Sequence, residues 1–133
     1  MERIIRTRTF QDQDRVYEIQ AEVLVSGRDI CVVISGGDLP HIGAVALASL
    51  AESPNDPQRQ SATPSVLTVP GHKEYHLALA AAEALSKTLE RTVAVSVGIH
   101  IEDITPEMID KVEEEFHFLV ADLADFITAK KFI

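Results

Sequence analysis

TVAVSVGIHI, residues 92–101, is the stretch that decides the fold of this chain. Valine or isoleucine occupies every second position from Val93 to Ile101, and small or polar side chains occupy most of the positions between them. A period of two over this length predicts a β-strand with one face in a hydrophobic core. The other face carries almost no bulk before His100. We therefore expect either another backbone or a ligand to come close to it, or a face that is solvated or covered by a helix.

Amphipathic helices are expected before and after this strand in the sequence, over residues 73–89 and from Thr105 to about residue 128. In the first, Leu77 and Leu85 belong to an apolar stripe at helical spacing. In the second, Thr105-Pro106-Glu107 combines a capping residue, a proline at the first helical position and an acid in the first turn. These signals predict a helix–strand–helix order in the C-terminal half.

Five further strands are expected before the first helix, over residues 3–10, 15–25, 30–34, 43–50 and 65–69. The apolar run 30–34 predicts a central strand covered on both faces, with Cys31 as a buried, inert thiol. Residues 51–64 are rich in proline and polar side chains, and they are predicted to form the one long loop. A loop of this length in a small domain is either functional or mobile.

This order of elements predicts an α+β fold, with a mostly antiparallel five- to six-stranded sheet and two helices packed on one face. The chain shows no internal repeat and no linker, so residues 1–133 are expected to form a single domain. Two helices can cover only one face of such a sheet. We therefore expect the uncovered face or an edge strand to be used in self-association, as a homodimer or a higher homo-oligomer.

The composition restricts the classes of partner. The formal net charge of −9 repels a phosphate backbone, so we expect no nucleic-acid partner. No apolar run approaches the ~20 residues of a membrane-spanning helix, and no signal-peptide core follows the first residues. We therefore expect no membrane association and a cytoplasmic location. The single cysteine excludes an internal disulfide.

Three of the histidines stand at predicted strand ends or turns, each close to glycine: His41, His72 and His100. One interpretation is a metal site, because imidazoles with Asp38, Glu74 or Asp103 nearby would suit zinc. The sequence has no closely spaced pair such as His-x-His and no HExxH motif, so we expect no metal. The structural alternative is that each histidine satisfies its own turn and that the three are unrelated.

A site for a small anion is favoured over a metal. Pro70-Gly71-His72-Lys73 opens a predicted helix, whose free N–H groups attract phosphate or carboxylate. His72, Lys73 and Arg59 would add donors, and Gly36-Gly37 is a second candidate cradle. A plain helix start is the structural alternative for His72-Lys73.

Nucleophilic catalysis is the weakest interpretation. Cys31 lies within a predicted strand, and no serine stands in a nucleophile elbow. Asp38 or Glu102 beside a histidine would suit general acid–base chemistry, but such pairs are common in proteins of this size.

Three blocks occur in order along the chain: GGDLPHIGA at residues 36–44, SATPSVLTVPGHK at residues 61–73 and GIHI at residues 98–101. In content and spacing they resemble the prenylated-flavin chaperone-like (LpdD-like) family, which includes the small D subunits of gallate and vanillate decarboxylase systems. The likeness runs from about residue 15 to the last predicted helix.

The resemblance implies a non-catalytic accessory protein that binds prenylated FMN or FMN and delivers it to a UbiD-type (de)carboxylase. It supplies the flavin and the decarboxylase partner but no map of binding residues. The expected cofactor-binding residues therefore rest on motif position and donor chemistry: Gly36, Gly37, Asp38, His41, Arg59, His72, Lys73 and His100. We expect the three turn histidines to face one pocket, with Arg59 closing over it from residues 51–64. The alternative is a small enzyme that uses the His- and Asp-bearing turns, with or without a metal.

Overall fold

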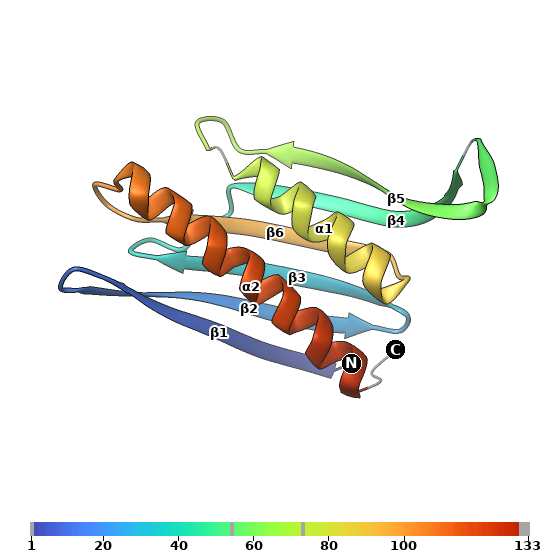
Figure 1. Ribbon diagram of the computed structural model, residues 1–133, viewed down its shortest axis with the longest axis horizontal. Helices are drawn as coiled ribbons and strands as arrows, with labels where there is room; N and C mark the ends of the chain where they lie inside the picture. The colour runs from blue at the N-terminus through green and yellow to red at the C-terminus, as the bar shows by residue number, and fades with distance from the viewer. Residues whose placement is uncertain (1, 54, 73, 131–133) are drawn as a thin grey trace.

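The alternating residues of the decisive stretch form β6 (Val93–His100), one of the two central strands of a six-stranded sheet (Figure 1). The computed structural model describes residues 2–53, 55–72 and 74–130. Its other elements are β1 (Glu2–Asp12), β2 (Arg15–Ser26), β3 (Asp29–Gly37), β4 (Ala44–Ser53), β5 (Asp56–Thr68), α1 (Tyr75–Leu89) and α2 (Pro106–Lys130). The predicted α+β fold, with a mostly antiparallel sheet and two helices, is confirmed.

The strands lie in the order β1-β2-β3-β6-β4-β5, so β6 is inserted between β3 and β4. The β3–β6 pair is parallel, and the other neighbouring strands are antiparallel. β3 and β4 follow one another in the sequence but are separated in the sheet by β6. Residues 38–43, which join them, must therefore cross the end of β6.

Both helices lie on the same face of the sheet (Figure 1). α1 packs against β4, β5 and β6, whereas α2 packs against α1, β1 and β2. The hydrophobic core lies between the helices and the sheet, with Leu85, Val95 and Phe116 among its fully buried side chains. Within the described residues, neither helix combines the length and the apolar composition that crossing a membrane requires.

Charged side chains point inward from the edge strand β1 and pair with α2. Arg6 contacts Asp122 at 2.9 Å, and Arg8 contacts Glu115 at 2.7 Å. Inward-pointing charges of this kind discourage the pairing of an edge strand with foreign strands. The second helix is thus held by ion pairs at its outer side as well as by apolar contacts.

The predicted loop over residues 51–64 is wrong, because residues 51–53 and 56–64 belong to the two strands of a long β4–β5 hairpin. The two strands pair from Ala44 and Thr68 to Ser53 and Asp56, with a register shift between Glu52 and Ser53. β5 is an edge strand, where prolines are tolerated because one side of the strand has no neighbour. The polar, proline-containing composition is typical of a loop, but pairing with β4 supplies backbone hydrogen bonds to β5.

The prediction that residues 30–34 are covered on both faces is also wrong. Val32 and Ile34 are fully buried on the helix side, whereas Val33 is 41% exposed on the opposite side. Cys31, predicted to be buried, shares the outer face and is exposed. The reason is that both helices lie on one face and nothing in the described part of the chain covers the other.

We expect Val95→Asp to unfold the protein. Val95 is fully buried in the central strand, and an unpaired buried charge costs several kcal/mol, a large part of the about 5–15 kcal/mol that stabilises a typical domain. Circular dichroism during thermal unfolding measures the effect. Val16→Asp, at a valine that is 65% exposed, is the control and should remain folded. A stable, cooperatively folded Val95→Asp variant would show that the core is assigned wrongly.

We also expect the uncovered face of the sheet to associate with the same face of a second copy. It exposes Val33, Val45, Leu47 and Leu67, which form an apolar patch from β3 to the edge strand β5 on a chain that is otherwise strongly acidic. In a twofold dimer, Leu47→Glu places a charge from each copy in one apolar contact. Light scattering at micromolar concentration should then report monomer for Leu47→Glu and dimer for Thr88→Glu, a change on the exposed side of α1. A monomeric wild-type protein would refute this association.

Candidate functional site

The segment that crosses the end of β6 brings its backbone into close contact with that strand. The N–H groups of Asp38 and Leu39 both donate to the carbonyl of His100, at 2.7 and 3.3 Å. Further along, the carbonyl group of His41 occupies the space that a Cβ atom on Gly98 would need. The small face of β6 therefore accommodates another backbone here, which is one of the alternatives that its sequence left open.

The glycine pair at the end of β3 allows the same close packing. A Cβ atom on Gly36 would collide with the backbone of Glu18 and Ile19 in β2. Gly37 has a φ of 79°, and its missing side chain leaves room for the carbonyl of His100. Because that carbonyl already takes the two N–H groups that follow, they are not free to cradle a phosphate. Contact of the glycine pair with a cofactor stays a prediction.

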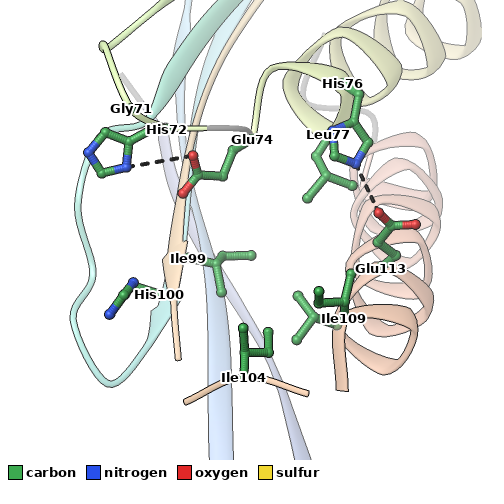
Figure 2. A pocket seen from close by; sticks show the side chains of 11 residues that line it. Gly71, His72, Glu74, His76, Leu77, Ile99, His100, Ile104, Ile109 and Glu113 are labelled. Carbon is green, nitrogen blue, oxygen red and sulfur yellow. Dashed lines mark hydrogen bonds and ion pairs between the residues drawn. The ribbon is translucent and has the colours of Figure 1, made fainter. Parts of the chain in front are cut away.

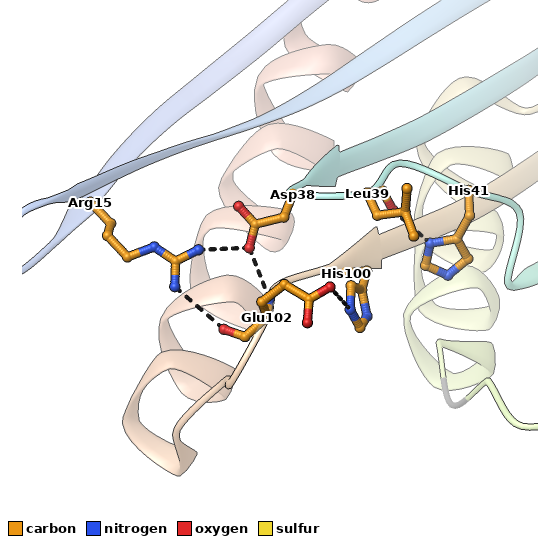
Figure 3. Close-up of polar contacts among 6 residues, drawn as sticks. All are labelled: Arg15, Asp38, Leu39, His41, His100 and Glu102. Atoms are coloured by element: carbon orange, nitrogen blue, oxygen red, sulfur yellow. Dashed lines mark hydrogen bonds and ion pairs between the residues drawn. The ribbon is translucent and has the colours of Figure 1, made fainter.

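Asp38 links three segments through one carboxylate oxygen (Figure 3). Its Oδ2 accepts hydrogen bonds from Nη2 of Arg15 at 2.7 Å and from the backbone N–H of Glu102 at 2.8 Å. The bond from Glu102, followed by the guanidinium of Arg15, lowers the pKa of the Asp38 carboxyl below its usual value. Asp38 thus ties β2 and the β6–α2 turn to the crossing segment, and its direct contact with a cofactor stays a prediction.

The structure brings the three predicted histidines together at one end of the sheet. The ring centroids of His41 and His72 are 4.5 Å apart, and those of His41 and His100 are 6.4 Å apart. His41 comes from the crossing segment, His72 from the turn before α1, and His100 from the end of β6. Segments far apart in the sequence meet here because the crossing and the turn lie beside the same strand end.

Glu74, directly before α1, carries a carboxylate between two of these histidines. Its Oε1 lies 2.7 Å from Nε2 of His41, and its Oε2 lies 3.9 Å from Nδ1 of His72. The Glu74 side chain is only 13% exposed, and Oε2 has no hydrogen-bond partner among the described residues. Gly43 provides the space, because a Cβ atom there would meet the carboxylate. We call His41, His72 and Glu74 the His–Glu cluster.

A cavity of about 550 Å³ opens beside the His–Glu cluster (Figure 2). Its apolar walls come from α1, β6, the β6–α2 turn and α2, and consist of Leu77, Ile99, Ile104, Ile109 and Val112. Its polar lining includes His72, Glu74, His76, His100 and Glu113. A largely apolar cavity of this size with a few polar groups is typical of sites for small organic molecules.

Of the predicted site residues, His72 and His100 line this cavity, whereas the described structure does not bring Arg59 to it. Arg59 belongs to β5 and lies nine residues before Thr68, the residue that pairs with the first residue of β4. At the rise of an extended strand this separation is about 30 Å along the hairpin, so Arg59 lies toward the opposite end of the sheet from the histidines. Its side chain, like the whole of Lys73, lies outside the described part of the chain.

Comparisons with known proteins agree on the family and on the fold. A family model described as the prenylated flavin chaperone LpdD-like domain matches residues 13–128. Protein LpdD of Lactiplantibacillus plantarum is 29% identical over an alignment of 106 residues, and the match covers 76% of this chain and 71% of that protein. The crystal structure of a novel chaperone complex for yeast 20S proteasome assembly aligns with a TM-score of 0.55 and 17% identity, over 96% of this chain and 98% of that chain. At 17% identity, the similarity to the solved structure shows a shared fold alone.

Asp38→Asn should destabilise the protein most at neutral pH. Because folding lowers the pKa of Asp38, its ionised carboxylate contributes stability above the ordinary aspartate pKa of about 3.9, and this contribution is lost as the pH falls through the lower folded-state value. Urea unfolding of wild type and variant at about pH 7 and about pH 3 should show a difference that shrinks at the acidic pH. Asp125→Asn, at an exposed position of α2, is the control. The same difference at both pH values would contradict the assigned role.

Proposed function

This chain belongs to the LpdD-like prenylated flavin chaperone family, and we propose on that premise that it binds prenylated FMN or FMN and delivers it to a UbiD-type (de)carboxylase. In this proposal the chain is an accessory protein and the chemistry takes place in the decarboxylase. The observation that carries the proposal is the cavity between α1, β6 and α2, whose lining residues all lie within the matched range.

The cavity has the size and the chemistry for the ring system of a flavin. Its volume of about 550 Å³ falls within the about 300–1,000 Å³ of small-molecule sites. Aliphatic walls such as Ile99 and Ile109 offer flat apolar contact to an aromatic ring and its prenyl-derived carbons. The imidazoles of His72 and His100 supply polar groups for the ring edge or the phosphate.

The position of Glu74 changes where a phosphate is expected. The sequence placed the phosphate at the start of α1, but the Glu74 carboxylate stands there, beside His41. A carboxylate repels a phosphate strongly at contact distance. We therefore place the phosphate toward the open side of the cavity, near His72 and His100, whose side chains are 38% and 44% exposed.

The cavity also suits a protein that hands its ligand on. Ile104 and Ile109, which form part of its wall, are 40% and 44% exposed. A ring held against them keeps an accessible edge, so a partner protein can reach the ligand before it is released. Transfer to a second protein needs such access, whereas a site that catalyses a reaction is better served by closing over its substrate.

The alternative of a small enzyme has one observation in its favour. His41 and Glu74 form a close imidazole–carboxylate pair beside the cavity, which is a combination used in general acid–base catalysis. The two functions differ in the fate of the ligand. A chaperone returns the flavin unchanged to a decarboxylase, whereas an enzyme converts a substrate in the absence of that partner.

We expect Ile109→Glu to weaken the binding of prenylated FMN and of FMN by about tenfold or more, because the new carboxylate is desolvated by the ligand and repels its phosphate. His72→Ala should weaken it by roughly tenfold, as loss of one charge-assisted hydrogen bond does. Anaerobic titration of the reduced flavins, followed by fluorescence or calorimetry, measures the affinities.

Val16→Glu introduces the same charge at an exposed valine outside the cavity and should bind flavin as the wild type does. If Ile109→Glu also binds like the wild type, the ligand lies elsewhere. If the wild-type chain binds neither flavin and does not raise the activity of an apo-decarboxylase, the proposed function is wrong.

A further inference from the structure

We propose that His41, His72 and Glu74 form a binding site for a zinc ion or a divalent transition-metal ion with similar ligand preferences. Each residue contributes one ligand atom, and these atoms all lie within 4.8 Å of one another. Two imidazole nitrogens and a carboxylate oxygen are a known ligand set of zinc sites that keep a further coordination position open. The proposal concerns the metal alone and stands whether or not the neighbouring cavity binds a flavin.

The separations between the ligand atoms are close to those of residues that bind one metal ion. Ligands at about 2.0–2.2 Å from a tetrahedral zinc ion lie about 3.3 Å from one another. The His41 Nε2 to Glu74 Oε1 distance is 2.7 Å, and the His72 Nδ1 to Glu74 Oε2 distance is 3.9 Å. Both distances are within about 0.6 Å of this value, and a small rotation of the side chains would correct such a difference. All three ligand atoms lie within 4.8 Å of one another, so rotations of the three side chains can bring them to a common ion.

The hydrogen bonding of His41 points to a positive centre between its ring and Glu74. Nδ1 of His41 lies 3.0 Å from the carbonyl of Leu39, and a carbonyl only accepts, so this nitrogen carries a proton. In a neutral imidazole the other nitrogen, Nε2, then presents a lone pair. That lone pair faces a carboxylate oxygen at 2.7 Å, which is repulsive unless a positive charge compensates it, either a proton on Nε2 or a metal ion that binds both atoms after a small side-chain rotation. Metal-bound histidines commonly donate their second N–H to a backbone carbonyl in this way.

The second carboxylate oxygen of Glu74 favours the metal over the proton. A proton on His41 satisfies only Oε1 of Glu74, whereas Oε2 is buried and has no hydrogen-bond partner among the described residues. A buried carboxylate oxygen without a partner is unfavourable. A metal ion within the cluster binds the carboxylate and both imidazoles at once, and so accounts for the arrangement of all three side chains.

The ligand chemistry also selects the class of ion. Imidazole nitrogen suits zinc, cobalt, nickel and copper, whereas magnesium and calcium prefer sites made entirely of oxygen. The ligands come from the crossing segment and from the residues before α1, so a bound ion would link these two segments. The open position lies on the side of the cavity, because His72 and Glu74 also line it. A water molecule or an anionic group of a ligand can occupy that position.

The test uses the full-length chain without a histidine tag, stripped of metal with a chelator. Zinc should bind with a stoichiometry of about one per chain in calorimetry, and cobalt(II) should give the visible absorption of a low-coordinate nitrogen–oxygen site. Glu74→Gln and His41→Ala should each lower the zinc affinity at least about tenfold, since even residues outside the ligand set have effects of this size.

Gly43→Ala tests the geometry with all three ligands retained. The new methyl group meets the end of the flexible Glu74 side chain, and the φ of Gly43 is not among the positive values, so the fold should persist while the zinc affinity falls. His117→Ala, at an exposed histidine of α2, should change nothing. The proposal is overturned if the wild type binds no zinc at micromolar concentration, or if His76→Ala abolishes binding that Glu74→Gln leaves intact. Flavin titration of the metal-stripped chain separates this outcome from failure of the proposed function.

Discussion

The crossing of residues 38–43 over the end of β6 is the constraint on which the rest of the structure depends. Because β6 is inserted between two strands that are consecutive in the chain, their connection has to pass over a strand end that is already in the sheet. The passage is tight enough that Gly98 has no room for a side chain. The carbonyl of His100 takes two N–H groups of the crossing segment, so the end of β6 also supplies the hydrogen bonds that hold it.

The same passage creates the chemical character of the site. It places the His41 ring beside the start of α1, and Gly43 leaves the space that the Glu74 carboxylate occupies. A largely buried carboxylate with one oxygen unpaired among the described residues contributes little to folding, because desolvation of a polar group without a partner costs about 1–3 kcal/mol. The core between the helices and the sheet supplies the stability that this end of the molecule lacks. Functional sites commonly contain such locally unfavourable groups, and the rest of the fold supplies the stability that compensates for them.

The features that the sequence predicted correctly have a local cause. The valine alternation of β6 and the capping residues before α2 act over a few neighbours, and both elements form where expected. The hairpin over residues 51–64 and the exposure of Cys31 depend instead on which strands pair and on which face the helices cover. The glycines close to His41, His72 and His100 correctly indicated that these histidines stand at strand ends or in the segments between elements. Glu74 appeared only as one of three nearby acids, since its contact with His41 depends on the crossing.

The insertion of β6 also has a consequence for the order in which the protein folds during synthesis. The β1–β3 meander and the β4–β5 hairpin are local structures, and each can form as soon as its own residues leave the ribosome. They cannot join into one sheet until residues 93–100 arrive to fill the place between them. Until then each part presents an unpaired strand edge, β3 on one side and β4 on the other. The nascent chain therefore carries two incomplete sheets from the completion of β5 at Thr68 until β6 begins at Val93, a period in which premature pairing with foreign strands is the main hazard.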